Sequence, residues 1–180
     1  MTTLLILRGI NGGSYHHVPM AALREYLTKA EFTRVSSYAT SGNLLFESSL
    51  APVACKQRVA DTLATHFDFP INFGIFDGAT ILSEMQAAPD WWDGQGHRQH
   101  MCLFKLTPAI DLDGWLRERL TPLDHVATTA HLIFWTVDTP GDFRHSAYGR
   151  VFGTPFYRQT STRSYRTTHK LAQLLRERED

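Results

Sequence analysis

The stretch that decides the fold is residues 4–20, LLILRGINGGSYHHVPM. Residues 4–7 form a short continuous apolar run, which is typical of a buried strand. Arg8 ends this run, and three glycines and Asn11 follow it before residue 14. Pro19 stands where the first residue of a helix is favoured, and apolar residues recur after it at helical spacing. The stretch therefore predicts a strand, a polar glycine-rich loop and a helix.

The residues that follow continue this pattern. FTRVSSYAT at 32–40 and LLF at 44–46 predict two strands, separated by a Ser-Gly-Asn turn. A second helix is predicted from Pro52, and INFGIF at 71–76 predicts a fourth strand. The resulting order, β-α-β-β-α-β, is that of a ferredoxin-like unit.

The same order recurs in the second half of the chain. A linker helix at about 78–88 and the loop APDWWDGQGHR come first. We then predict strands near 100–106, 123–127, 131–137 and around PFYRQT at 155–160, with helices near 108–119, near 142–151 and from about Thr167. The sequence thus predicts an α+β fold of two tandem ferredoxin-like (βαββαβ) halves plus a C-terminal helix. The expected boundaries are 1–77 for the first half, 78–97 for the linker helix and tryptophan-rich loop, 98–162 for the second half and 163–180 for the C-terminal helix.

The predicted topology brings two polar segments together. The first and second strands of such a unit run parallel, so the loop after the first strand and the turn before the third lie at one end of the sheet. We therefore expect Arg8 and Asn11 to lie near Ser41 and Asn43. Glycine lets backbone approach a ligand, and the guanidinium suits a carboxylate or phosphate. The alternative is structural, because Asn and Gly are common turn residues. Neither a P-loop nor a GxGxxG motif is present.

Four segments carry a resemblance to a known family. They are LRGINGGSYHHVPMAALREYL, YATSGNLLFES, APDWWDGQGHRQHMCLF and TSTRSYRTTHKLAQLL. Together they resemble the bacterial family called domain of unknown function 1697, and the likeness runs through nearly the whole chain. The resemblance implies an α+β fold with two ferredoxin-like parts, and it implies no activity.

The resemblance can be followed residue by residue. The family's Arg-Gly-Ile-Asn corresponds to residues 8–11 and its Ser-Gly-Asn to residues 41–43. Its C-terminal pattern of Thr-x-Arg-Asn-aromatic-Asn-Thr, with a Lys three residues on, is matched at Arg163, Tyr165, Thr167 and Lys170. This chain departs from the pattern at Ser164 and Arg166, which replace asparagines, and at residues 12–14, where Gly-Gly-Ser replaces Val-Gly-Gly.

The C-terminal segment offers a second candidate for anion binding. Thr167 is a plausible N-cap, and Arg163 and Arg166 lie close to the expected helix start, where backbone amides are unpaired. In the alternative interpretation Arg163 joins the two halves through hydrogen bonds to carbonyls. We hypothesise that this segment and the Arg8–Asn43 end of the first sheet face one cleft between the halves.

Composition limits the classes of function. The chain has 18 basic and 18 acidic residues, which argues against a dedicated nucleic-acid protein. Residues 150–180 carry seven basic and three acidic groups, a pattern usual for a solvated helix face. No signal peptide or membrane-spanning stretch is predicted, and Cys55 and Cys102 are expected to be buried free thiols. We therefore expect a cytoplasmic protein.

Other residues and motifs bear on alternative functions. Nine histidines, among them His97 and His100, suggest a metal site, but HExxH and CxxC are absent, so no metal is assigned. Trp91 and Trp92 could cap the core or line the cleft. GxSxG is absent, and nothing in the sequence supplies a base for Ser41. The sequence lacks the basic-glycine-aromatic pattern that is typical of RNA-binding ferredoxin-like sheets. Phe134 and Trp135 would point to opposite faces of their strand, so at most one of them could stack on a base.

The sequence favours a protein that binds a small anionic ligand at the polar end of the first sheet or between the halves. The expected ligand-binding residues are Arg8, Asn11, Ser41, Asn43, Arg163 and Lys170. An enzyme acting on a phosphorylated or acyl substrate is one alternative, with a histidine as base, and a nucleic-acid or protein interaction module is another. No cofactor is expected, nucleic acid is disfavoured as a partner, and the sequence does not decide the oligomeric state.

Overall fold

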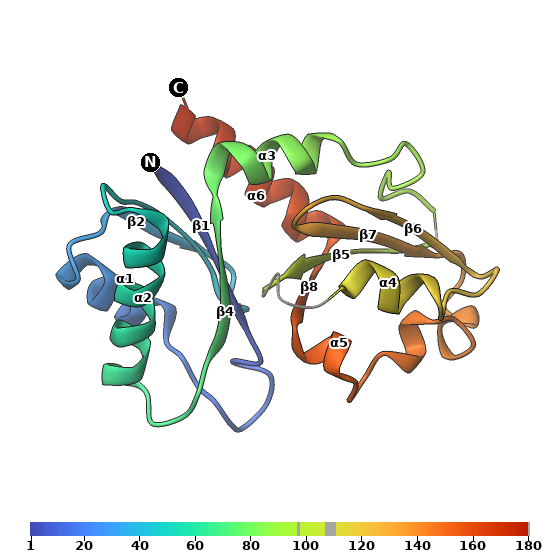
Figure 1. The fold of residues 1–180 in the computed structure, drawn as a ribbon, viewed down its shortest axis with the longest axis horizontal. Helices are drawn as coiled ribbons and strands as arrows, with labels where there is room; N and C mark the ends of the chain where they lie inside the picture. The colour runs from blue at the N-terminus through green and yellow to red at the C-terminus, as the bar shows by residue number, and fades with distance from the viewer. Residues whose placement is uncertain (97, 107–110, 180) are drawn as a thin grey trace. The chain divides into compact units, whose positions relative to one another are not determined.

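The structure is a computed structural model that describes residues 1–96, 98–106 and 111–179. The chain divides into two compact units (Figure 1). The first consists of Met1–Ile81 together with the end of the chain from Arg178, and the second is Leu82–Glu177. Each unit contains a four-stranded antiparallel sheet, so the predicted α+β fold with a C-terminal helix is confirmed.

The first unit has the predicted order of elements. They are β1 (Thr2–Arg8), α1 (Met20–Lys29), β2 (Thr33–Tyr38), β3 (Asn43–Glu47), α2 (Pro52–His66) and β4 (Asn72–Asp77). The strand order β2-β3-β1-β4 places β1 between β3 and β4. Both neighbours are antiparallel to β1, as the split βαβ arrangement requires.

One face of the first sheet packs against α1 and α2 (Figure 1). Leu5 and Leu7 of β1 join a buried core with Leu23 and Leu27 of α1 and Val59 of α2. Because side chains alternate along a strand, even-numbered residues of β1, Arg8 included, lie on the face turned away from these helices. This alternation decides which polar residues can meet Arg8.

The second unit repeats the topology. Its elements are β5 (Gln99–Lys105), α4 (Leu112–Arg117), β6 (Asp124–Thr128), β7 (Leu132–Val137), η1 (Asp142–Arg144), η2 (Tyr148–Arg150), α5 (Pro155–Arg158) and β8 (Thr160–Ser164). The strand order is β6-β7-β5-β8, and all pairs are antiparallel. Leu116, Trp135, Tyr148 and Phe156 belong to the core on one face of this sheet.

Two predicted elements of the second half are wrong. The helix predicted at 142–151 is two 3-10 turns, η1 (Asp142–Arg144) and η2 (Tyr148–Arg150). The turns pack closely on each other, because a Cβ on Gly149 would lie 2.1 Å from the Phe143 carbonyl oxygen. The strand predicted at 155–160 begins instead as helix α5, because the Thr154 side chain accepts the Tyr157 amide as an N-cap and Pro155 takes the first helical position. Of the helix predicted at 108–119, α4 forms the described part, and residues 107–110 with Ile110 lie outside the described residues.

Two helices, α3 (Gly78–Gln86) and α6 (Tyr165–Glu179), each contribute residues to both units. The start of α6 at Tyr165 lies within two residues of the predicted position of about Thr167. The N-cap predicted at Thr167 is wrong, because the Ser164 hydroxyl accepts the Thr167 amide at 3.2 Å and Ser164 is therefore the capping residue. At the other end, Arg178 donates a hydrogen bond to the Ser36 hydroxyl of β2 at 2.8 Å. No helix among the described residues is long and apolar enough to span a membrane.

Candidate functional site

The loop after β1 meets the turn between β2 and β3. The Asn11 side-chain amide donates to the Thr40 carbonyl at 2.7 Å, and the Leu7 amide donates to the Gly42 carbonyl at 2.8 Å. The two segments are about thirty residues apart in sequence. Their predicted convergence at one end of the first sheet is confirmed.

Asn11 holds the glycine-rich loop in shape. Its side chain accepts the Val18 amide at 2.8 Å and donates to the Val18 carbonyl at 2.9 Å. Its own φ is 54°, in the left-handed region that Asn tolerates better than most residues. Together with the bond to Thr40, these contacts use both polar atoms of the amide. Asn11 therefore orders the loop, as the structural alternative expected.

Gly42 is required where the turn crosses β1. Its φ is 80°, and a Cβ there would lie 2.5 Å from the Leu7 Cβ. Only glycine meets both conditions, because other residues are strained at this φ and would clash with the neighbouring strand. The turn consequently lies directly against the end of β1.

Three polar residues share one face of the sheet at this end. Arg8 is paired with Asn72 of β4, and Ile6, two residues earlier on β1, is paired with Asn43 of β3. Arg8, Asn43 and Asn72 therefore all lie on the face turned away from α1 and α2. We call this group, together with Ser41, the sheet-end cluster.

Within the cluster, Asn43 is buried and Arg8 is half-buried. The Asn43 amide donates to the Tyr38 carbonyl at 2.9 Å and to the Ser41 hydroxyl at 3.0 Å, which fixes the Ser41 side chain. Asn72 is exposed, and sequence analysis missed it. The predicted topology held a signal for it, because the fourth strand of a ferredoxin-like unit runs beside the first and its first residue opposes the end of β1.

Arg163 and Lys170 lie in the second unit. Arg163 is on β8 and not at the start of α6, and it is 6% exposed. Its guanidinium donates to the Ser161 hydroxyl and the Thr162 carbonyl, both at 2.8 Å. Burial lowers the pKa of Arg163 to about 10, so it stays cationic at neutral pH. Lys170 donates to Gln173 within α6 at 3.0 Å. That these two residues share a cleft with the sheet-end cluster stays a prediction.

The tryptophan-rich loop covers the face of the second sheet that is turned away from α4. Trp92 is 6% exposed, donates from its indole to the Met101 carbonyl at 2.9 Å and packs edge-on against Phe134. Gly94 follows with φ 71°, and a Cβ there would lie 2.5 Å from the Tyr165 ring. Phe134 and Trp135 do point to opposite faces, and both are completely buried. Neither ring is therefore presented to a nucleic-acid base.

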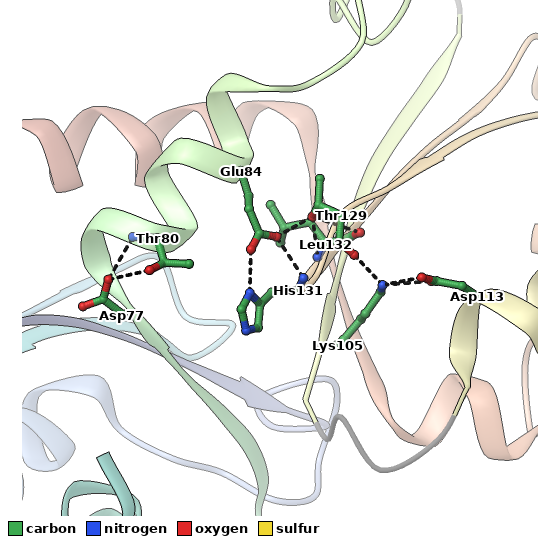
Figure 2. A network of polar contacts seen from close by, with 8 residues as sticks. All are labelled: Asp77, Thr80, Glu84, Lys105, Asp113, Thr129, His131 and Leu132. Atoms are coloured by element: carbon green, nitrogen blue, oxygen red, sulfur yellow. Dashed lines mark hydrogen bonds and ion pairs between the residues drawn. The ribbon is translucent and has the colours of Figure 1, made fainter. Parts of the chain in front are cut away.

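A polar network in the second unit was not expected from the sequence (Figure 2). Glu84 of α3 accepts hydrogen bonds from the Thr129 hydroxyl and, at 2.8 Å, from the His131 amide. Its other oxygen lies 2.6 Å from His131 Nδ1. Lys105 joins the network by donating to the Thr129 carbonyl at 2.6 Å and pairing with Asp113 at 2.8 Å.

The network sets the protonation of Glu84. Burial alone raises the pKa of this carboxyl, but the hydrogen bonds from Thr129 and His131 outweigh it, and the pKa lies below its usual value. Glu84 is therefore ionised at neutral pH and fixes one nitrogen of the His131 ring. Sequence analysis could not find this pair, because 47 residues separate its members.

The structure also bears on the metal and thiol chemistry considered from the sequence. No group of three or more metal-ligating side chains occurs among the described residues, and His97 lies outside them. Cys55 and Cys102 are buried free thiols, as predicted. Burial raises the pKa of both, so neither is a thiolate at neutral pH.

Comparison with protein families matches residues 1–133 to the family described as "Protein of unknown function (DUF1697)". This chain belongs to the DUF1697 family. Arg8, Asn11, Ser41 and Asn43 lie within the matched residues, whereas Arg163 and Lys170 lie beyond them.

A solved structure is similar to this chain beyond the residues that the family comparison matches. Conserved bacterial protein SP0830 from Streptococcus pneumoniae is 28% identical, with a TM-score of 0.86 over 97% of this chain and 98% of that one. The similarity therefore includes the second unit of this DUF1697 protein. Comparison with curated proteins gives no match.

Proposed function

We propose that this DUF1697 protein binds a small anionic ligand at the sheet-end cluster. The observation that carries the proposal is the strand register, which puts Arg8 opposite Asn72 and next to Asn43 on one face. Arg8 would supply the positive charge. Asn72 and Ser41 would orient the ligand through hydrogen bonds.

The surrounding backbone favours this assignment. Gly9, Gly13 and Gly42 have positive φ, and neither Gly9 nor Gly13 has an atom within 4 Å of the position that a Cβ would take. Backbone can therefore approach a ligand closely in this loop. An arginine guanidinium can donate two parallel hydrogen bonds to one carboxylate or phosphate group. We therefore expect the ligand to have a carboxylate or a phosphate group. Asn11 has a supporting role, because its amide holds the loop in place.

Thermal-shift measurements with inorganic phosphate, nucleotides and small dicarboxylic acids test the proposal. We expect at least one of these anions to raise the melting temperature of the wild type. Arg8→Ala should abolish the shift. Arg8→Lys should weaken it, because lysine keeps the positive charge but cannot donate two parallel hydrogen bonds to one anion. Lys56→Ala is the matched control, since it removes one exposed positive charge from α2 of the same unit.

The proposal would be wrong if Arg8→Ala kept its fold, shown by circular dichroism, and still responded as Lys56→Ala does. Arg163→Ala and Lys170→Ala belong in the same series, because both residues are predicted to bind the ligand. If only these two variants lost the response, binding would belong to the second unit and not to the sheet-end cluster.

A second candidate function is acid–base catalysis at His131. The specific observation is the 2.6 Å contact between Glu84 and His131 Nδ1, the arrangement by which a carboxylate orients an imidazole. The His131 side chain is 44% exposed, so a substrate could reach the ring. Such an activity should be lost in His131→Gln, whereas His125→Gln, at the exposed His125–Asp138 pair of the same unit, should leave it unchanged.

A further inference from the structure

A cavity of about 540 Å³ lies in the second unit, apart from every residue discussed as a site above. It is bordered by α4 and the residues after it on one side and by η2 and the start of α5 on the other. Its volume falls within the usual range for small-molecule sites. The residues that decide its chemistry are Trp115, Arg119, Leu120 and Arg150.

Trp115 forms a fixed apolar wall of the cavity. Its ring stacks on Phe156 with 4.6 Å between centroids and 15° between planes. The Arg119 guanidinium lies 4.2 Å from the Trp115 ring centroid and donates to the Trp115 carbonyl at 2.8 Å. These contacts fix the orientation of the Trp115 indole, and Leu120 extends the apolar lining.

The charge on the lining is positive. Arg119 is paired with Glu118 at 3.1 Å, so that carboxylate is already neutralised. Arg150 is different: within residues 1–96, 98–106 and 111–179, its exposed guanidinium makes no hydrogen bond or ion pair. An unpaired arginine beside an apolar wall is suited to a ligand that has an anionic group attached to an apolar body.

We propose that this cavity binds a small aromatic or branched carboxylic acid, with the carboxylate on Arg150 and the apolar body along Trp115 and Leu120. The two parts of the site explain the ligand class. A bare anion would leave the apolar wall uncovered, and a neutral apolar molecule would leave the Arg150 guanidinium without a partner. Thr154 does not contribute a donor, because its hydroxyl already donates to the Val151 carbonyl.

Nuclear magnetic resonance tests the proposal through the indole N–H signals of the four tryptophans. The Trp115 signal is identified by its loss in Trp115→Phe. The probe is 3-phenylpropionate, with propionate and 3-phenylpropanol as controls that lack the ring or the charge. We expect 3-phenylpropionate to shift the Trp115 signal with a Kd of about 1 mM or tighter, and both controls to bind at least tenfold more weakly.

Two variants separate specific binding from a general charge effect. Arg150→Ala should weaken 3-phenylpropionate binding at least tenfold. Arg144→Ala removes a similar exposed arginine from the neighbouring η1, outside the cavity, and should change the Kd less than twofold. The proposal is overturned if the Trp115 signal does not respond at 10 mM probe, if 3-phenylpropanol binds as well as the acid, or if the two arginine variants behave alike.

Discussion

At the residue scale, the Asp124 carboxylate joins three segments of the second unit through hydrogen bonds. It accepts hydrogen bonds from the Trp135 indole and the Ala147 amide, both at 2.8 Å, and from the Thr121 hydroxyl. Burial raises the pKa of Asp124, but these bonds outweigh burial and lower it. One carboxylate therefore joins β6, β7 and the turn before η2.

Replacing this carboxylate should destabilise the protein. We expect Asp124→Asn to lower the free energy of unfolding by about 1.5–3 kcal/mol at pH 7, because an amide cannot accept all these bonds and leaves the buried Trp135 indole poorly paired. Urea unfolding followed by tryptophan fluorescence measures the loss. The control Asp138→Asn removes an exposed ion pair with Arg98 and an exposed contact with His125, and should cost less than about 1 kcal/mol. Equal losses would contradict the role assigned to Asp124.

Glu84 should make stability depend on pH. Its pKa in the folded protein is below the value of about 4.3 that an unfolded chain has, so its ionised form stabilises the fold above that pH. This contribution is lost as the pH falls through the lowered folded pKa. We expect Glu84→Gln to cost about 1–3 kcal/mol at pH 7 and much less at pH 3.

Urea unfolding at pH 7, 4.5 and 3 checks this expectation. Glu118→Gln is the control, because the Glu118 side chain is 76% exposed and its substitution should change stability by under about 0.5 kcal/mol at each pH. If the free energies of unfolding of wild type and Glu84→Gln differed by the same amount at every pH, the negative charge of Glu84 would make no contribution to stability.

At the element scale, the glycine turn before β3 positions the candidate site. Gly42→Ala should lower the free energy of unfolding by more than about 1 kcal/mol, because φ is 80° and the new Cβ would meet Leu7. The control Gly12→Ala has ordinary φ and a nearest contact of 3.9 Å, so it should be close to neutral. Circular dichroism during urea unfolding measures both, and similar values for the two variants would contradict this explanation.

The first unit was predictable from sequence element by element because each local signal agreed with the fold. Apolar runs, helix-starting prolines and the Ser-Gly-Asn turn all favoured the same order. At 155–160 the signals disagreed: aromatic residues favoured a strand, whereas Thr154 and Pro155 formed the start of a helix. The helix start prevailed because the Thr154 hydroxyl accepts the Tyr157 amide, which an extended strand would leave unpaired at this position.

The candidate site was predictable to a different extent at each residue. Topology alone brought Arg8 and Asn43 together, since strand order decides which ends meet. It could not show that the Asn11 amide is used by Val18 and Thr40, because that depends on the loop's backbone conformation. Contacts between distant positions, such as Glu84 with His131, leave no local pattern at all.

At the scale of the whole molecule, the two units have separate cores and separate optical probes. Leu23 belongs to the core of the first unit, whereas all four tryptophans lie in the second. Tryptophan fluorescence therefore reports the unfolding of the second unit, and far-UV circular dichroism reports both. If each core stabilises its own unit, the two signals need not change together.

Leu23→Ala tests this independence. The side chain is completely buried, so its truncation should cost the first unit about 2–5 kcal/mol. We expect the circular dichroism transition in urea to become broader or biphasic while the midpoint from tryptophan fluorescence stays within error of wild type. Leu116→Ala, in the core of the second unit, should instead move the fluorescence midpoint. If Leu23→Ala moved both signals equally, the two units would unfold as one cooperative body, because a loss in one core would then be shared by the other.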